Sequence, residues 1–221
     1  MLPLEVFPDA VEAGKRVAAL VADQARKAVE SRGHFSLAVS GGKTPDEMFR
    51  ALAAEDVPWS QTSVYQVDER VAPAGDPDRN LTRLLAALPA AAVGSVRPMP
   101  VEEPDLERAA ERYAAELPDR LDLVHLGLGA DGHTASLVPG DPVLDVRDRM
   151  VALTHEYEGR RRMTLTYAAL EDAREIAWLV TGEEKRGALA RLLAGAETIP
   201  AARIANPRQL VVADAEAAPA P

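Results

Sequence analysis

Apolar residues follow two kinds of spacing along this chain, one typical of helices and one typical of buried strands. Between Pro8 and about Arg32 they recur every three or four positions, which predicts a helix that stops at Gly33. Short apolar runs predict strands buried on both faces, because such strands lose the polar–apolar alternation. The predicted strands span residues 34–39, 62–67, 121–126, 175–181 and 209–212. After a short irregular piece and the segment 150–154, the β-branched residues of 160–167 predict a strand that passes into a short helix.

Helical spacing returns between these strands, near residues 81–88, 104–117 and 183–193. A further helix is expected to begin with Thr44 as N-cap, Pro45 at the first position and Glu47 completing a capping box. Strands that alternate with helices predict an α/β fold, here a three-layer αβα domain with a Rossmann-like, mostly parallel sheet. We assign residues 1–213 to this single domain and expect the Ala- and Pro-rich tail, residues 214–221, to be frayed.

The stretch Leu121–Gly140 carries the most suggestive chemistry. A buried strand is followed by three closely spaced glycines, with Asp131 and His133 between and after them. Glycines let the backbone turn sharply near a ligand, and a histidine with an ordinary pKa near ~6.5 can take and return a proton at neutral pH. Because ligands bind at the carboxyl ends of strands in open α/β sheets, this turn is a candidate active site. Asp131 has a second interpretation, as the cap of a following helix.

Two other predicted strands end in polar residues. Ser40-Gly41-Gly42-Lys43-Thr44 follows the strand at 34–39 and opens a helix, a combination that suits an anion. Asp68-Glu69-Arg70 follows the strand at 62–67. Either motif alone is also typical of an ordinary turn or a charged strand end. A parallel sheet would bring both to the same edge as the Asp131–His133 turn, and that convergence favours a site.

The remaining histidines and basic residues have plainer interpretations. We interpret His125, inside an apolar strand, as a satisfied core residue, and His34 and His155 as exposed positions near the ends of elements. The run Arg160–Arg162 and the helical Lys185 are typical of solvated faces. No cluster has convincing metal-ligand spacing, so we expect no metal.

Composition narrows the class of partner. The chain has 35 acidic and 25 basic residues and a formal net charge of −10, which disfavours nucleic acid. A phosphorylated small molecule remains compatible, because one phosphate needs only a few local cations and N–H groups. Cysteine is absent, no apolar stretch approaches the ~20 residues of a membrane span, and no signal peptide is visible. We therefore expect a cytoplasmic protein without membrane contact; no feature predicts its oligomeric state.

Four motifs in order resemble the signatures of the 6-phosphogluconolactonases. They are Ser40-Gly-Gly-Lys-Thr-Pro45, Asp68-Glu-Arg70 with Asn80 downstream, Gly127-Leu-Gly-Ala-Asp-Gly-His-Thr-Ala-Ser-Leu-Val-Pro-Gly140, and Arg162-Met-Thr164. Glucosamine-6-phosphate deaminases resemble this chain in the Asp-Gly-His segment, but there an Ile-Ala-Phe-Asn-Glu-like run follows the histidine. Thr134-Ala-Ser-Leu137 stands in its place here and favours the lactonase. The chain departs from the family pattern at Lys43 and Val138.

The resemblance implies a fold of the glucosamine-6-phosphate deaminase and ribose-5-phosphate isomerase type. It implies hydrolysis of 6-phospho-D-glucono-1,5-lactone to 6-phospho-D-gluconate in the oxidative pentose phosphate pathway, without a cofactor. We expect His133 to act as general base toward water and then as acid, with Asp131 or Asp68 orienting it. N–H groups of the Gly129–Gly132 turn are candidates for binding the oxyanion. The expected phosphate- and substrate-binding residues are Ser40, Gly41, Gly42, Lys43, Arg70, Asn80, Arg162 and Lys185.

Two other functions stay open at this point. One is an amino-sugar-phosphate deaminase or aldose–ketose isomerase that uses Asp68 and His133 for proton transfer. The other is a sugar-phosphate-binding module without catalysis.

Overall fold

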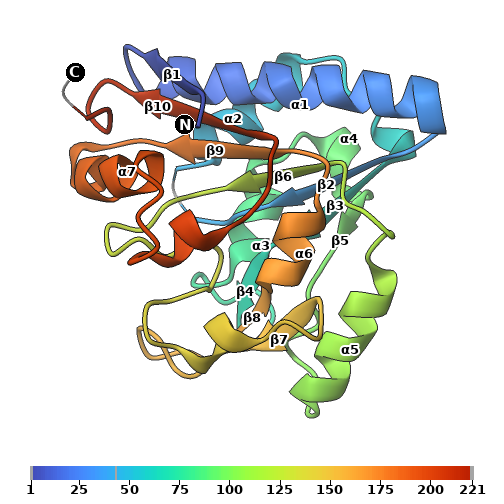
Figure 1. Ribbon diagram of the computed structural model, residues 1–221. Helices are drawn as coiled ribbons and strands as arrows, with labels where there is room; N and C mark the ends of the chain where they lie inside the picture. Colours follow the sequence, from blue (N-terminus) through green and yellow to red (C-terminus); the bar gives the residue numbers. More distant parts are fainter. Residues whose placement is uncertain (1, 43, 220–221) are drawn as a thin grey trace.

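A central parallel sheet organises the computed structural model, which describes residues 2–42 and 44–219. Its strands follow the order β1-β10-β9-β6-β2-β3-β5, and every neighbouring pair is parallel (Figure 1). The strands are β1 (Leu4–Phe7), β2 (Phe35–Val39), β3 (Thr62–Gln66), β5 (Val96–Arg97), β6 (Leu123–Leu126), β9 (Ile176–Val180) and β10 (Gln209–Asp214). The short edge strands β1 and β5 are additions to the strands that the apolar pattern predicts.

A second, antiparallel sheet lies below the first in Figure 1. It contains β4 (Asp68–Arg70), β8 (Arg162–Leu165) and β7 (Val151–Leu153), in the order β4-β8-β7. Asp68–Arg70 is thus a strand of its own, which leaves the parallel sheet after β3 and pairs with β8. The sequence analysis expects polar residues at the end of the preceding strand here, so β4 is not predicted as a strand, and neither is the separate sheet, which depends on long-range packing.

Helices cover both faces of the parallel sheet and complete the three-layer αβα fold. One apolar cluster joins the sheet to α1 (Ala10–Arg32), α2 (Asp46–Ala51), α3 (Asn80–Ala87) and α4 (Ala90–Val93). The other joins it to α5 (Leu106–Glu116), α6 (Tyr167–Asp172), α7 (Arg186–Leu193) and the small sheet (Figure 1). Short 3-10 helices lie at η1 (Leu52–Ala54), η2 (Trp59–Gln61), η3 (Pro142–Asp145), η4 (Glu183–Lys185) and η5 (Pro200–Arg203). The predicted fold class is confirmed.

Helix α1 shows how the sequence sets its own boundaries. The Asp9 carboxylate accepts a hydrogen bond from the backbone N–H of Glu12 at 2.9 Å and caps the first turn. Gly33 ends the helix in the left-handed region, with φ 77°, and its N–H returns to the carbonyl of Val29. One apolar face between these caps is buried against the sheet and α2. The helix at the predicted residues is therefore confirmed.

The expected cap of α2 is wrong. The helix begins at Asp46, Pro45 occupies the N-cap position, and no side chain caps the helix. Glu47 pairs with Arg50 one turn later instead of reaching back to the chain entry. Thr44 lies in the turn before the helix, where it lines the cavity described below.

The C-terminal residues enter the fold further than the sequence predicts. Asp214 is the last residue of β10, and its buried carboxylate accepts hydrogen bonds from the N–H groups of Gly182 and Ala217. Ala217 is buried in the same apolar cluster as α7. The tail is therefore packed, not frayed, over residues 214–218, because one carboxylate ties it to the turn after β9. None of the helices in the described residues is both long enough and apolar enough to cross a membrane.

Candidate active site

Strands β6, β2 and β3 are neighbours in the sheet, so the three polar strand ends lie side by side as predicted. They open into a cavity of about 310 Å³. The candidate residues from the sequence that line it are Ser40, Gly41, Gly42, Asp68, Arg70, Asn80, His133, Arg162 and Lys185. Lys43, the other expected phosphate ligand, lies outside the described residues.

His133 and Asp131 form a close pair at the mouth of β6. The imidazole Nδ1 lies 2.6 Å from Asp131 Oδ1, and the backbone N–H of His133 donates to the same oxygen at 3.1 Å. No helix follows Asp131, so the capping interpretation of this residue is wrong. Instead, Asp131 holds the ring and the backbone of His133 together.

The charge of Asp131 fixes the tautomer of the ring. Partial burial alone would raise the pKa of Asp131, but hydrogen bonds from His133 and the Tyr157 hydroxyl hold this pKa below its ordinary value. An ionised carboxylate only accepts hydrogen bonds, so Nδ1 carries the proton and Nε2 keeps a free lone pair. This arrangement suits a base that removes a proton from a cavity water.

Gly129 is the residue that makes room for this pair. A Cβ at Gly129 would lie 2.2 Å from His133 Nδ1 and 2.6 Å from Asp131 Oδ1, closer than any side chain tolerates. The N–H of Gly129 donates to the carbonyl of His133, and the N–H of Gly132 donates to the carbonyl of Gly129. Both glycine N–H groups are thus used inside the turn, so the expectation that these two bind the oxyanion is wrong.

Asp68 contacts other partners than His133. Its Oδ2 accepts from the Ser136 hydroxyl at 2.6 Å, and its Oδ1 accepts from Asn80 Nδ2 at 3.1 Å. Burial raises the pKa of Asp68, against the hydrogen bond from Ser136 and the charges of Arg70 and Arg162. Of the two carboxylates considered for orienting His133, only Asp131 is in hydrogen-bond contact with the ring.

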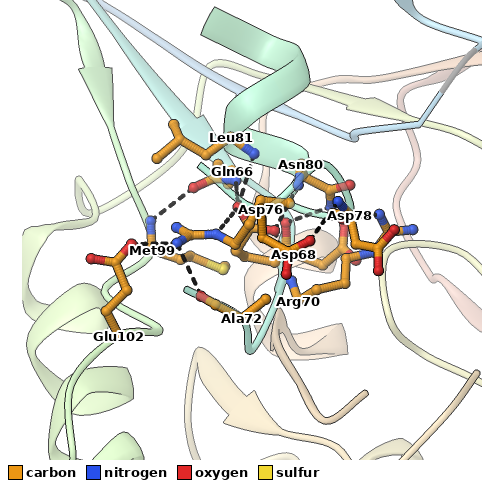
Figure 2. Close-up of polar contacts among 12 residues, drawn as sticks. Gln66, Asp68, Arg70, Ala72, Asp76, Asp78, Asn80, Leu81, Met99 and Glu102 are labelled. Atoms are coloured by element: carbon orange, nitrogen blue, oxygen red, sulfur yellow. Dashed lines mark hydrogen bonds and ion pairs between the residues drawn. The ribbon is translucent and has the colours of Figure 1, made fainter. Parts of the chain in front are cut away.

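Glu69, between Asp68 and Arg70, has a structural role in the protein interior. It is fully buried, and its two oxygens accept from the backbone N–H groups of Arg70, Asn80 and Leu81 and from Gln66 Nε2. These four partner residues are labelled in Figure 2. An ion pair with Arg79 adds a charge partner at 3.1 Å. The N–H groups of Asn80 and Leu81 belong to the first turn of α3, so the Glu69 carboxylate on β4 caps this helix. The sequence carries no local signal for such a cap.

Arg70 and Arg162 face each other across the β4–β8 pair, where they are directly opposite in register. Like charges at opposite positions destabilise a sheet unless an anion or acid lies between them. Their Nε atoms are buried without a hydrogen-bond partner among the described residues, while other guanidinium nitrogens contact Asp78 and Glu158. Two arginines with donors to spare in one cavity suit a phosphate, which guanidinium groups bind in a bidentate manner.

The Ser40–Gly42 turn also lines the cavity. The Ser40 hydroxyl donates to the carbonyl of His125 and accepts from the N–H of Gly127, so it ties β2 to β6. A Cβ at Gly41 would lie 2.2 Å from Asn80, which means that the asparagine packs directly on this turn. The Asn80 side-chain amide donates hydrogen bonds to the backbone carbonyl and to Oδ1 of Asp68, so Asn80 positions Asp68.

The contacts of two residues of the site, His125 and Tyr157, differ from what the sequence predicts. His125 is completely buried as expected, but both of its ring nitrogens lack a hydrogen-bond partner among the described residues, so it is not satisfied. Tyr157 lies beside His133 and bonds to Asp131, although it follows no strand end of the parallel sheet. A weak signal existed for Tyr157, since Glu158-Gly159 predicts a tight turn, but not for where its ring points.

Comparison with known proteins agrees with this geometry. The sequence profile described as "Glucosamine-6-phosphate isomerases/6-phosphogluconolactonase" matches residues 8–213. A 6-phosphogluconolactonase of Mesorhizobium japonicum is 37% identical over 97% of this chain and 91% of its own length. A 6-phosphogluconolactonase of Synechocystis is 35% identical over 81% and 80%, respectively.

Solved structures give the same picture. The 6-phosphogluconolactonase of Thermotoga maritima superposes with a TM-score of 0.84 at 25% identity, covering 97% of this chain and 99% of that one. A monomeric glucosamine-6-phosphate deaminase superposes with a TM-score of 0.86 over 98% of both chains at 19% identity, a likeness of fold. With a family profile that spans nearly its whole length, this chain belongs to the family of glucosamine-6-phosphate isomerases and 6-phosphogluconolactonases.

Proposed function

We propose that this protein is a 6-phosphogluconolactonase, which hydrolyses 6-phospho-D-glucono-1,5-lactone to 6-phospho-D-gluconate in the oxidative pentose phosphate pathway. The observation that carries the proposal is the presence, in one cavity, of an oriented imidazole and an opposed pair of arginines. The imidazole supplies proton transfer, and the arginines supply a place for a phosphate. The two relatives named above, from Mesorhizobium japonicum and Synechocystis, carry this activity in their names.

The chemistry follows from the free lone pair on His133 Nε2. This nitrogen removes a proton from water as the water oxygen attacks C1 of the lactone, and the carbonyl electrons move onto the oxyanion. When the tetrahedral intermediate collapses, the C1–ring oxygen bond breaks and the imidazolium returns the proton to the departing oxygen. Asp131 stabilises the imidazolium through the 2.6 Å contact to Nδ1. Such acid–base catalysis contributes typically ~10²–10⁴-fold.

The phosphate is proposed to lie among Arg70, Arg162, Lys185 and the Ser40–Gly42 turn. Arg162 is only 4% exposed, so its interaction with a phosphate is little screened by solvent. The phosphate does not react, but its binding energy places C1 of the lactone beside His133 and so aids catalysis.

A deaminase or isomerase is the alternative that one observation favours. Asp68 lines the cavity, and burial raises its pKa, which are the properties of a group that transfers protons. Against this role, both Asp68 oxygens accept hydrogen bonds from Ser136 and Asn80, and Ser136 belongs to the segment that resembles the lactonases. A binding module without catalysis would not need an imidazole oriented for proton transfer, as the His133–Asp131 pair provides.

Two assays separate these functions. Lactone generated in situ from glucose 6-phosphate should disappear faster with the protein than without it, and glucosamine 6-phosphate should release no ammonia. Ammonia release would establish the deaminase, and phosphate-dependent binding with no turnover of either compound would establish the binding module.

The reaction is proposed to need no metal and no cofactor, and the protein to act in the cytoplasm on a small sugar-phosphate lactone without nucleic-acid partners. Incubation with EDTA should leave kcat unchanged. A loss of activity that added divalent metal restores would contradict the metal-free mechanism.

A further inference from the structure

Tyr157 lies between the two groups to which the proposed function gives separate tasks. Its hydroxyl donates to Asp131 Oδ2 at 3.3 Å, and its ring meets the His133 ring edge-on, with centroids 5.6 Å apart. On its other side, the guanidinium carbon of Arg162 lies 4.8 Å from the Tyr157 ring centroid. One side chain thus contacts both the proton-transfer pair and an arginine of the proposed phosphate site.

The backbone holds Tyr157 in a narrow turn between β7 and β8. The N–H of Tyr157 donates to the carbonyl of Arg160 at 3.0 Å, and the reverse bond measures 3.3 Å. The two residues between them, Glu158 and Gly159, have φ angles of 51° and 77°, as a two-residue hairpin turn requires. Arg160 anchors the turn through ion pairs to Asp76 and Asp78. The ring therefore projects from a hydrogen-bonded two-residue hairpin turn.

The two contacts of Tyr157 respond to different events. Stacking of a guanidinium on an aromatic face depends on where the guanidinium is held. The Arg162 guanidinium lies over the ring, where it donates to the exposed carboxylate of Glu158 at 2.9 Å and to the carbonyl of Tyr157 at 3.5 Å, and its Nε has no partner among the described residues. A phosphate that also binds Arg162 would restrain the guanidinium in this place, and the restrained ring would hold its hydroxyl on Asp131.

We propose that Tyr157 is a positioning residue that couples phosphate binding at Arg162 to the orientation of the His133–Asp131 pair. The coupling means that the phosphate of the substrate raises kcat and does not only lower KM, since its binding energy is used to orient the reacting groups. This inference rests on the proposed function, because it assigns a phosphate to Arg162 and proton transfer to His133.

The kinetic test compares 6-phosphoglucono-1,5-lactone with glucono-1,5-lactone, which lacks the phosphate. The variants are Tyr157→Phe, which removes the hydroxyl and keeps the ring, and Tyr157→Leu, which removes both contacts. Tyr167→Phe is the matched control. Its hydroxyl donates to Pro200 and Arg147 stacks on its ring at 4.3 Å, but it lies outside the cavity.

For Tyr157→Phe, kcat on the phosphorylated lactone should fall about tenfold with little change in KM, the effect of one charge-assisted hydrogen bond. On the unphosphorylated lactone kcat should change far less, because only Glu158 and the carbonyl of Tyr157 then hold the Arg162 guanidinium over the ring. Tyr157→Leu should lower the ratio of the two kcat values further, and Tyr167→Phe should leave it unchanged. Equal losses on both lactones, or no loss, would overturn the coupling.

A second measurement needs no turnover and so separates this inference from the proposed function. Inorganic phosphate is titrated into the full-length protein while NMR follows the His133 ring. The four histidines of the chain keep the spectrum simple. Phosphate should shift the His133 signals in the wild type and in Tyr167→Phe, but much less in Tyr157→Leu. Equal shifts in all three proteins, or none in the wild type, would refute the coupling, whereas failure of the lactone assay alone would refute only the proposed reaction.

Discussion

The chemistry proposed for this site depends on a single hydrogen, the one on His133 Nδ1. Asp131 keeps it there because its carboxylate stays ionised, and this leaves Nε2 free toward the cavity. The glycine at position 129 is part of the same arrangement, since any larger residue would occupy the space of the imidazole and the carboxylate.

Replacing Asp131 by Asn tests that dependence. The asparagine oxygen would still face the backbone N–H and Nδ1 of His133, but the variant lacks the negative charge that stabilises the imidazolium formed when Nε2 takes a proton. We expect kcat to fall by roughly 10²–10⁴-fold with KM within a few-fold of the wild type. Initial rates on the phosphorylated lactone measure both constants. An unchanged kcat would exclude Asp131 from the mechanism.

His125 makes a prediction about stability and pH. Burial lowers the pKa of its ring to about 3, whereas an unfolded histidine has a pKa near ~6.5. Between these two pKa values His125 is protonated in the unfolded chain but neutral in the folded protein. The unfolding free energy therefore falls as the pH falls from about 6.5 toward 3. The loss from this one group is about 1.4 kcal/mol per pH unit.

The variant His125→Leu removes that proton. We expect its unfolding free energy to fall less steeply than that of the wild type between pH 7 and pH 5, as measured by urea denaturation. His34→Leu serves as the control, because His34 is exposed at the start of β2. Parallel slopes for the wild type and His125→Leu would show that the folded protein accepts a proton at His125.

At the scale of elements, the small antiparallel sheet and α3 are joined through Glu69. Its buried carboxylate accepts hydrogen bonds from the start of α3 and pairs with the buried Arg79. The connection sets β4 in place, and with it Asp68 and Arg70 on the cavity wall (Figure 2).

We expect Glu69→Ala to lower the unfolding free energy by about 3–5 kcal/mol, since it leaves buried N–H groups and a buried guanidinium uncompensated. The control is Glu102→Ala, which removes the half-exposed second partner of the same arginine and should cost ~0–1 kcal/mol. Chemical denaturation of both variants gives the comparison. Similar losses for the two would mean that burial of Glu69 contributes little.

The elements differ in how far the sequence predicts them. Helix α1 is predicted nearly to the residue, because its caps and its apolar face are local features. The start of α2 is not, since the turn before it is shaped by Asn80 packing on Gly41, a contact between distant segments. For the same reason the sequence locates β7 and β8 approximately but predicts neither β4 nor the separate sheet, which depends on pairing across about ninety residues.

At the scale of the whole molecule, the order of the strands explains why the site could be predicted at all. Strands β6, β2 and β3 lie next to one another, so polar residues at their carboxyl ends converge even though they are far apart in sequence. That logic locates Ser40, Asp68 and His133. The strand order does not predict Tyr157, which comes from a hairpin of the second sheet. It also cannot tell whether Asp131 or Asp68 orients His133, because that depends on distances between side chains.

We propose that His133 acts as the general base when a phosphorylated sugar lactone is hydrolysed in this cavity. The most direct measurement generates 6-phosphoglucono-1,5-lactone in situ and follows its loss by NMR with wild-type protein, with His133→Ala and with no protein. We predict rapid loss with the wild type, and loss close to the uncatalysed rate with His133→Ala, although the variant still binds 6-phosphogluconate. Equal rates for the wild type and His133→Ala would exclude His133 as the general base.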